Sequence, residues 1–344
     1  MGTLVVARSG KLDRIPSRAT TRVPTPHHVR PRPYRKGHPY RKGSMDSHIQ
    51  RILSLVPGWE DGGATVTPLI GGITNQNYRV DIGEESFVLR IGGKGTHLLG
   101  IDRQRESICT AIAAQIGVGA QVLYFLASEE VLITRFITGD AVTPETAAQP
   151  TTLRRIVDAM KRYHAGPPFP GTFSPFETVR SYHRLALKYG VSFPDTLPQV
   201  FVLMTRIEQA LGNVTSSKPC HNDLLASNFI DDGHTIWILD WEYAAMGDIF
   251  FDLGNFSVNQ SLNEEQCELL LNSYFGAVRS AHLAHLHLMR LSSDLRESFW
   301  GFLQLGISEL DFDYKEYAHH HLNRFLHNVE TSPFEKWLYD VEHS

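Results

Sequence analysis

The hydrophobic pattern of the chain changes once, close to residue 139, and this change restricts the folds that the sequence can adopt. Before it, three β-rich runs each end at a glycine, as strands of a small sheet commonly do. These runs cover residues 64–70, 77–82 and 86–91. Two further apolar runs, 122–127 and 131–137, are separated by Glu129-Glu130 and predict another pair of strands.

A helix is predicted between the third and fourth of these strands. Asp102 is a typical N-cap residue, and the isoleucines Ile108, Ile112 and Ile116 follow at the spacing of one helical stripe. The order of elements therefore predicts a small antiparallel sheet with one helix packed on it.

After Gly139 the pattern is mainly helical, with a short β-like stretch at residues 229–230 and 236–239. The predicted helices cover residues 151–165, 176–189, 196–212, 264–277, 281–309 and 315–328. A sheet-rich part followed by a helix-rich part predicts an α+β fold with two lobes, an N-lobe at 45–138 and a C-lobe at 139–344. Ligands commonly bind in the cleft between two such lobes.

Residues 1–44 form a separate segment, which holds 11 Lys or Arg residues and one acidic residue, Asp13. It has no hydrophobic periodicity and is rich in Arg and Pro, so we expect a disordered basic leader. Alternative interpretations are a targeting peptide, a basic arm for nucleic acid or anionic membrane, and a leader upstream of a true start at Met45.

The remainder of the chain carries a formal charge of −14, obtained from 22 basic and 36 acidic residues. An acidic body suits a small cationic substrate better than a nucleic acid, so no stable nucleic-acid partner is expected. The cysteines, Cys109, Cys220 and Cys267, are odd in number and far apart, which predicts a reducing, cytoplasmic location. No apolar run predicts a transmembrane segment, and a homodimer is one candidate assembly.

The strongest chemical signal is the sequence His221-Asn222-Asp223, followed five residues later by Asn228 and twelve further on by Asp240. Phosphoryl transfer needs a carboxylate beside the attacking hydroxyl group, ligands for Mg²⁺, and cations on the phosphates. Asp223 is the candidate for the first role, and Asn228 and Asp240 are the candidate Mg²⁺ ligands. His221 is expected to pack and hydrogen-bond in support of the loop rather than to act as a base.

Two weaker signals lie upstream in the predicted sheet. The turn at Gly71-Gly72-Ile73-Thr74-Asn75 is a candidate for phosphate binding through its backbone, in particular at Gly72, Thr74 and Asn75, and a simple hairpin turn is the alternative. Arg90 ends the third strand, where it is a candidate phosphate-binding cation, and Glu106 on the following helix is its candidate partner.

At these residues the sequence resembles the choline/ethanolamine kinase branch of the aminoglycoside phosphotransferase-like superfamily, over nearly all of residues 65–328. The segments that carry the resemblance are GGITNQNYRV, FVLRIGG, IDRQRE, HNDLLASNFI, ILDWEYA, FDLGN and FWGFLQLGISELDFDYKEYA. The resemblance implies a protein-kinase-like fold and an enzyme that uses ATP with Mg²⁺.

The resemblance also implies roles for single residues. These are Asp223 as the catalytic Asp, Arg90 in place of the usual strand Lys, Glu106 as its partner, Asn228 and Asp240 as metal ligands, and Asp252 as a brace for the catalytic loop.

The acceptor implied by the resemblance is choline or ethanolamine. In the family, equivalents of Glu242, Tyr243 and Trp300 line the choline pocket, where aromatic faces hold a cation that has no N–H group. The eukaryotic choline kinases have a second Trp three positions after the first, and this chain has Leu303 there. A core position in a buried helix is the alternative for Trp300.

Two other functions compete with a choline/ethanolamine-type kinase. One is an aminoglycoside- or thiamine-type phosphotransferase with the same machinery, and the other is a catalytically silent scaffold with the kinase fold. The histidine clusters at 282–287 and 319–321 lack the carboxylate or cysteine that would complete a tetrahedral metal site, so ordinary helix histidines are expected.

Overall fold

The structure, a computed structural model, describes residues 47–59, 63–69, 75–212 and 216–344. The predictions for the leader at 1–44 and for Gly72 and Thr74 lie outside these residues. By its contacts the chain divides into two compact units, one at residues 6–63 and one that holds residues 64–344. Helix α1, Ser47–Ser54, belongs to the first unit, and all other elements belong to the second.

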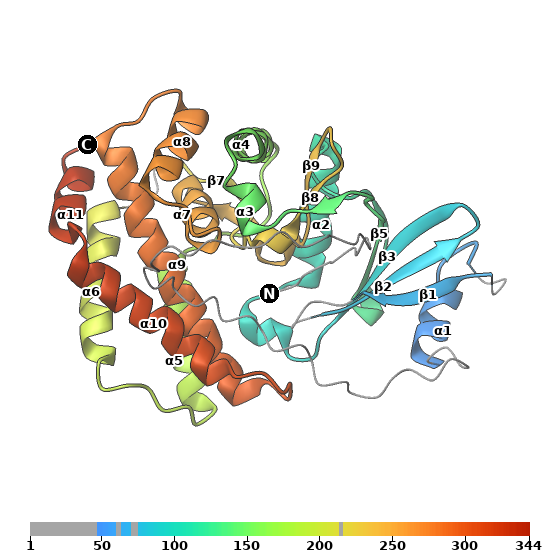
Figure 1. Cartoon of the computed structure of the whole chain (residues 1–344). Coiled ribbons are helices and arrows are strands. Elements are labelled where there is room, and N and C mark those ends of the chain that lie inside the picture. Colours follow the sequence, from blue (N-terminus) through green and yellow to red (C-terminus); the bar gives the residue numbers. More distant parts are fainter. Residues whose placement is uncertain (1–46, 60–62, 70–74, 213–215) are drawn as a thin grey trace, which may run out of the picture. The chain divides into compact units, whose positions relative to one another are not determined.

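Within the described residues, five antiparallel strands form the main sheet, in the order β1-β2-β3-β5-β4 (Figure 1). The strands are β1 Thr65–Leu69, β2 Asn75–Ile82, β3 Glu85–Gly92, β4 Val122–Leu126 and β5 Val131–Arg135. Along β3 the side chains alternate between buried and more exposed, which is the pattern expected of a sheet with one covered face.

Helix α2, Arg103–Ile116, connects β3 to β4. Asp102 caps it as predicted, because its side chain accepts a hydrogen bond from the Arg105 N–H at 3.0 Å. The predicted apolar stripe is wrong in part, because Ile108 is 39% exposed while Cys109 and Ala113 are fully buried. The face that starts with Arg103 and Glu106 packs inward instead, because these charged residues belong to a buried ion-pair cluster in the site.

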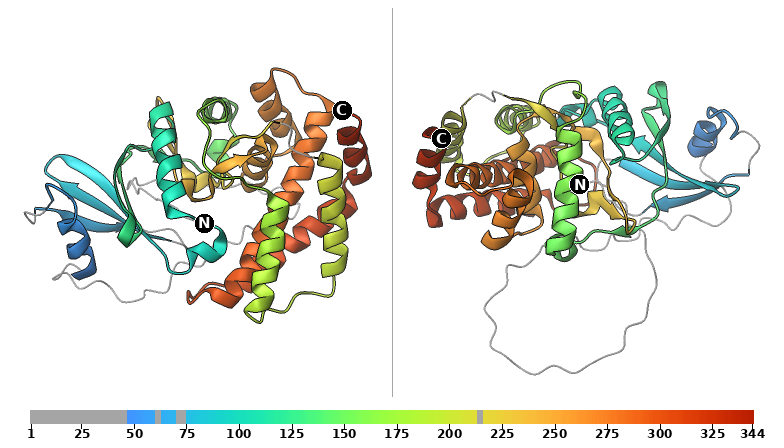
Figure 2. Two further views of the ribbon diagram at one scale, coloured as in Figure 1. Left: turned by 180° about the vertical axis from the view of Figure 1, so that it is seen from behind. Right: turned by 90° about the horizontal axis from the view of Figure 1, so that it is seen from above.

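The second part is mainly helical, and long helix α9 packs against its neighbours on several sides (Figure 2). The helices are α3 Pro144–Ala147, α4 Pro150–His164, α5 Pro175–Lys188, α6 Leu197–Leu211, α7 Ile249–Asn259, α8 Glu264–Phe275, α9 Ser280–Ile307, α10 Tyr314–Thr331 and α11 Phe334–Glu342. Short strands interrupt them: β6 Asp140–Ala141, β7 Lys218–Cys220, β8 Phe229–Asp231, β9 Ile236–Ile238 and β10 Ala245–Gly247.

The predicted α+β class, with a small antiparallel sheet before a mainly helical part, is confirmed. The predicted boundary at residues 138 and 139 stays a prediction. Helix α7 was not predicted, because nine of its residues are buried all around its surface and leave no 3.6-residue pattern.

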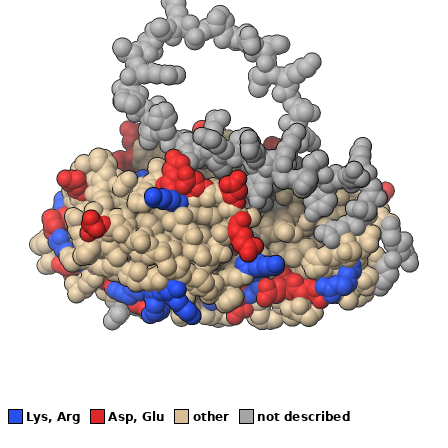
Figure 3. All heavy atoms as spheres, turned by 90° about the horizontal axis from the view of Figure 1, so that it is seen from below, with Lys and Arg blue, Asp and Glu red and all other residues tan. Residues whose placement is uncertain are grey.

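The described helices include none that is both long and apolar enough to cross a membrane. Cys109, Cys220 and Cys267, all of them described, are free and buried. On the face drawn in Figure 3, acidic and basic side chains of the described residues are interspersed. The absence of a stable nucleic-acid partner, a homodimer and a cytoplasmic location stay predictions.

The crossing of α7 and α9 depends on Gly254. A Cβ atom at this position would lie 2.8 Å from the backbone carbonyl carbon of Met289 on α9, closer than packed atoms tolerate. The glycine therefore allows the two helix backbones to approach closely, and this approach sets the position of α7 beneath the loop at 221–228.

We expect Gly254→Ala to lower the free energy of unfolding by about 1–3 kcal/mol, the range of overpacked cores, although alanine favours helix formation. Chemical denaturation measures the change. Gly63→Ala is the control, because a Cβ atom there meets nothing within 4 Å. Equal stability of the two variants would show that the close helix crossing does not constrain α7.

Candidate active site

The β8–β9 hairpin brings the two predicted metal ligands to the same place. The Leu239 N–H donates to the Asn228 carbonyl oxygen at 2.8 Å, which extends the pairing of β8 with β9. Because Asn228 immediately precedes β8 and Asp240 follows closely after β9, both lie at one end of this antiparallel hairpin. Both also line a pocket to which the sheet contributes Arg90.

Two buried oxygen atoms, Oδ1 of Asn228 and Oδ2 of Asp240, have no hydrogen-bond partner among the described residues. The Asn228 amide nitrogen donates to the Asp223 carbonyl oxygen at 2.9 Å, which orients the side chain. Buried polar atoms without a partner cost free energy unless a ligand satisfies them. Mg²⁺ prefers carboxylate and amide oxygens, so these two atoms fit the predicted Mg²⁺ site.

Asp240 also has a left-handed backbone conformation and a raised pKa. Its φ angle is 68°, in the left-handed region, and the φ angle of Asn222 is 65°. Such conformations cluster at functional sites. Burial raises the pKa of Asp240 to about 7, against the opposing charge of Arg90. A bound cation would favour the charged carboxylate.

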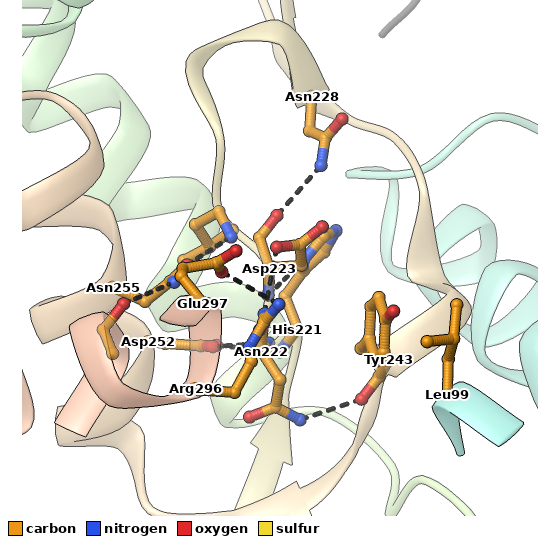
Figure 4. A network of polar contacts seen from close by, with 12 residues as sticks. Leu99, His221, Asn222, Asp223, Asn228, Tyr243, Asp252, Asn255, Arg296 and Glu297 are labelled. Carbon is orange, nitrogen blue, oxygen red and sulfur yellow. Dashed lines mark hydrogen bonds and ion pairs between the residues drawn. The ribbon is translucent and has the colours of Figure 1, made fainter. Parts of the chain in front are cut away.

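Helix α7 holds the loop at 221–228 through two side chains that lie one turn apart (Figure 4). The Asp252 carboxylate accepts the backbone N–H groups of His221 at 2.8 Å and Asn222 at 2.7 Å. Asn255 Oδ1 accepts the N–H of Leu224 at 2.6 Å. Residues three apart face the same way on a helix, so one face of α7 positions the backbone on both sides of Asp223.

The Asp252 carboxylate is fully buried and receives further donors from α4. The Tyr163 hydroxyl donates to Asp252 Oδ2 at 2.7 Å, and His164 Nε2 lies 3.0 Å from the same oxygen. Burial alone would raise the pKa of Asp252, but the hydrogen bond and charge of His164, with His221 and Tyr163, lower it below the ordinary value. The carboxylate therefore remains an acceptor at neutral pH.

The His221 ring uses both of its nitrogens to hold the loop. Nδ1 accepts the Asp223 N–H at 3.2 Å, and Nε2 lies 2.9 Å from the Leu239 carbonyl oxygen, to which it donates. The ring also packs against Trp241, with centroids 4.7 Å apart. Burial lowers the pKa of His221, so the ring is neutral with its proton on Nε2.

Arg90 on β3 lies between two carboxylates. Its Nη1 atom is 2.5 Å from Glu106 Oε1, and its Nη2 atom is 2.5 Å from Asp240 Oδ1. Glu106 is in the first turn of α2, where the helix dipole favours a negative charge. The sheet, α2 and the β9 end are thus tied together at the pocket by one guanidinium group.

A second arginine, Arg103, extends this cluster and was not identified from the sequence. Its Nη1 atom is 2.6 Å from Glu106 Oε2 and 3.1 Å from Glu242 Oε2, and its Nη2 atom donates to Asn75 Oδ1 at 2.7 Å. Asn75 in turn donates to Glu242 at 2.9 Å. The predicted nucleotide-binding Asn75 and the predicted acceptor-binding Glu242 therefore contact each other, and both roles stay predictions.

The predicted acceptor-binding aromatic residues lie in one buried apolar cluster. Tyr243 is 6% exposed and Trp300 is 2% exposed. Trp300 packs edge-on against Tyr314 and Tyr317, with centroid distances of 5.8 and 5.6 Å. The arrangement fits the core alternative for Trp300, and its contact with an acceptor stays a prediction.

Asp223 has a buried cationic partner, Arg296, that was also missed from the sequence. The Arg296 Nη2 atom donates to Asp223 Oδ1 at 3.0 Å. The two residues are 73 positions apart, and Arg296 lies inside a long predicted helix whose pattern gives no sign of such a contact. The FDLGN segment, by contrast, allowed Asp252 to be singled out from the sequence.

An antiparallel sheet with a cationic side chain on its third strand, next to Asp and Asn side chains from a mainly helical part, is typical of protein-kinase-like phosphotransferases. The sequence model of the choline/ethanolamine kinase family matches residues 66–269, which is more than half of the chain. The chain therefore belongs to the choline/ethanolamine kinase family.

Individual relatives agree with this assignment. Protein LicA of Haemophilus influenzae is 28% identical over 220 residues, which cover 62% of this chain and 63% of the relative's length. The probable ethanolamine kinase A of Dictyostelium discoideum is 28% identical over 302 residues, with coverages of 77% and 86%. A choline/ethanolamine kinase family protein from Mesorhizobium loti has a similar crystal structure, with a TM-score of 0.76, 29% identity and coverages of 86% and 99%.

The predicted family, the protein-kinase-like fold and the class of enzyme, an ATP-dependent phosphotransferase with an alcohol group as acceptor, are confirmed by these similarities. The identity of the acceptor and the roles of the single residues stay predictions.

We expect Asp252→Asn to lower the free energy of unfolding at pH 7 by about 2–4 kcal/mol, because an amide cannot accept all the donors that converge on the carboxylate. The folded-state pKa of Asp252 lies below its ordinary value. Its stabilising effect is therefore present above about pH 4 and is lost as the pH falls through the folded pKa.

Urea unfolding of wild type and variant at pH 7 and at pH 3 measures this difference, with the exposed Asp158→Asn as the control. The deficit of Asp252→Asn should shrink at the lower pH. A deficit that is constant with pH would show that the charge of Asp252 does not hold the loop.

Proposed function

We propose that this protein transfers the γ-phosphoryl group of ATP to the hydroxyl group of a small cationic amino alcohol, with ethanolamine and choline as the leading candidates. The observation that carries the proposal is a pair of buried oxygens, from Asn228 and Asp240, that line one pocket and have no hydrogen-bond partner among the described residues. The amide group of Asn228 also donates to the backbone carbonyl of Asp223, which ties the metal candidate to the loop of the candidate base. The relatives that are named as ethanolamine kinases support this choice of acceptor.

In the proposed reaction Asp223 accepts a proton from, or orients, the acceptor hydroxyl group. Its Oδ1 atom is held by Arg296, which leaves Oδ2 as the oxygen for the acceptor. General-base assistance of this kind typically contributes about 10²–10⁴-fold to a rate. The bonds from α7 to the backbone on either side fix the carboxylate before the acceptor binds.

Asn228 Oδ1 and the Asp240 carboxylate would hold Mg²⁺, which would neutralise charge on the transferring phosphate. Arg90 adds a fixed positive charge at the same pocket, and Glu106 keeps its guanidinium group in place. Because arginine stays protonated at all working pH values, this charge does not depend on pH.

A panel of acceptors tests the proposal directly. Steady-state release of ADP is measured with ethanolamine, choline, thiamine and an aminoglycoside, each with and without Mg²⁺. Stimulation by an amino alcohol supports the proposal, and stimulation by thiamine or the aminoglycoside alone assigns the alternative phosphotransferase activity. Failure of every acceptor would favour a catalytically silent scaffold.

We expect Asp223→Ala to lower kcat by about 10²–10⁴-fold, because the acceptor hydroxyl group loses its base while nucleotide binding is retained. Stopped-time assays measure kcat, and fluorescent-nucleotide titration measures affinity. Asp158→Asn should leave both values unchanged. A near-normal kcat for Asp223→Ala would remove this residue from the reaction.

For Asp240→Ala we expect the Mg²⁺-dependent affinity for ATP to fall by at least about 10- to 100-fold, because loss of an outer-shell partner of a metal ligand already costs this much. Isothermal titration of ATP at fixed Mg²⁺ concentrations measures it. Affinity without Mg²⁺ serves as the internal control and should change much less. The same loss with and without Mg²⁺ would contradict the metal-binding role.

A further inference from the structure

Arg296 brings a buried positive charge to Asp223. It lies on α9 and is 2% exposed. Its Nη2 atom donates to the Asn222 carbonyl oxygen at 2.5 Å and to Asp223 Oδ1 at 3.0 Å, and its Nη1 atom lies 2.9 Å from Glu297 Oε1. The guanidinium group therefore joins the loop at 221–228 to α9, as Figure 4 shows.

The same guanidinium group lies over the ring of Tyr243, on which the resemblance predicts cation binding. The Arg296 Cζ atom is 5.0 Å from the ring centroid, within the range of a cation–π contact. Leu99 belongs to the same apolar cluster as Tyr243, and Figure 4 draws it on the side of the ring away from Arg296. A quaternary ammonium group would therefore meet an aromatic face that already carries a cation.

The charged groups joined at Arg296 carry a net negative charge. The carboxylates of Asp223 and Glu297 together with the guanidinium group sum to a net charge of −1. Glu297 Oε2 accepts the Tyr317 hydroxyl at 2.6 Å, which holds this carboxylate in place. One small ammonium group can be balanced here by the carboxylates without an aromatic partner.

The two candidate acceptors differ in how they can use such a site. A primary ammonium group donates up to three hydrogen bonds, and carboxylate oxygens are its natural acceptors. A quaternary ammonium group has no N–H and depends on aromatic faces and on unshielded negative charge. A site whose tyrosine face is covered by a guanidinium group therefore favours the primary ammonium.

From these contacts we infer that Arg296 determines acceptor specificity: it positions Asp223 and, by covering Tyr243, selects primary over quaternary amino alcohols. The inference rests on the proposed phosphorylation of an amino alcohol and adds to it a residue that chooses between the acceptors. Arg296 acts on the reaction through Asp223 and is a positioning residue, not a base.

Steady-state kinetics of wild type and Arg296→Ala with ethanolamine and choline test the inference. Wild type should have the higher kcat/KM with ethanolamine. In the variant, the ratio of kcat/KM for choline to that for ethanolamine should rise by about 2- to 30-fold, the range that a cation–π contact supplies. A wild type that prefers choline, or an unchanged ratio in the variant, would overturn the inference.

Chemical rescue separates this role from a purely structural one. Guanidinium ion at millimolar concentration should raise the kcat of Arg296→Ala with ethanolamine. It should also compete with choline, so that the preference of the wild type for ethanolamine over choline is restored. A structural role predicts no response to guanidinium. Arg206→Ala is the control, because Arg206 forms a surface ion pair with Glu335 and should show neither effect.

Binding of tetramethylammonium and methylammonium ions provides a measurement that does not require turnover. Tetramethylammonium should bind Arg296→Ala more tightly than wild type by a similar factor, and methylammonium should not. Should Arg296→Ala fail to fold, Arg296→Lys keeps the charge but loses the planar contact with Tyr243. This variant should also raise the choline-to-ethanolamine ratio of kcat/KM and the affinity for tetramethylammonium. If no amine stimulates turnover, the proposed function fails, and equal tetramethylammonium affinity would separately reject the role of Arg296.

Discussion

The hydrogen bonds to the buried Asp252 carboxylate are the constraint on which the rest of the site depends. Two consecutive backbone N–H groups of the loop at 221–228 and side chains of α4 all converge on this one group. Displacing the loop would remove two of the donors to this buried anion, and a buried charge that loses its partners costs up to several kcal/mol. Because Gly254 lets α7 approach α9 closely, the helix packing and the position of Asp223 are parts of one arrangement.

A second buried cluster, which includes the pocket residues Arg90 and Asp240, is ordered by alternating charges. The carboxylates of Glu106, Asp240 and Glu242 have oxygen atoms within 4.8 Å of one another, and Arg90 and Arg103 lie between them. Carboxylates this close repel each other unless cations separate them. The arginines therefore hold the sheet, α2 and the end of β9 together, while Asp240 Oδ2 has no hydrogen-bond partner among the described residues.

Much of this arrangement could be predicted from the sequence, because it depends on local patterns. The strand runs, the Asp102 cap and the spacing of Asp223, Asn228 and Asp240 are all short-range features. Arg103 and Arg296 were missed because their partners are distant in sequence, and an arginine within a helix is usually solvated. The inward face of α2 was misjudged for the same reason, since buried ion pairs replace the apolar stripe.

A crystal structure of the protein with Mg²⁺ and a non-hydrolysable ATP analogue tests the central claim most directly. The account predicts a magnesium ion about 2.0–2.1 Å from both Asn228 Oδ1 and an Asp240 carboxylate oxygen, with the terminal phosphate directed toward Asp223. A nucleotide-bound metal ion that contacts neither side chain, or a triphosphate that points away from Asp223, would contradict it.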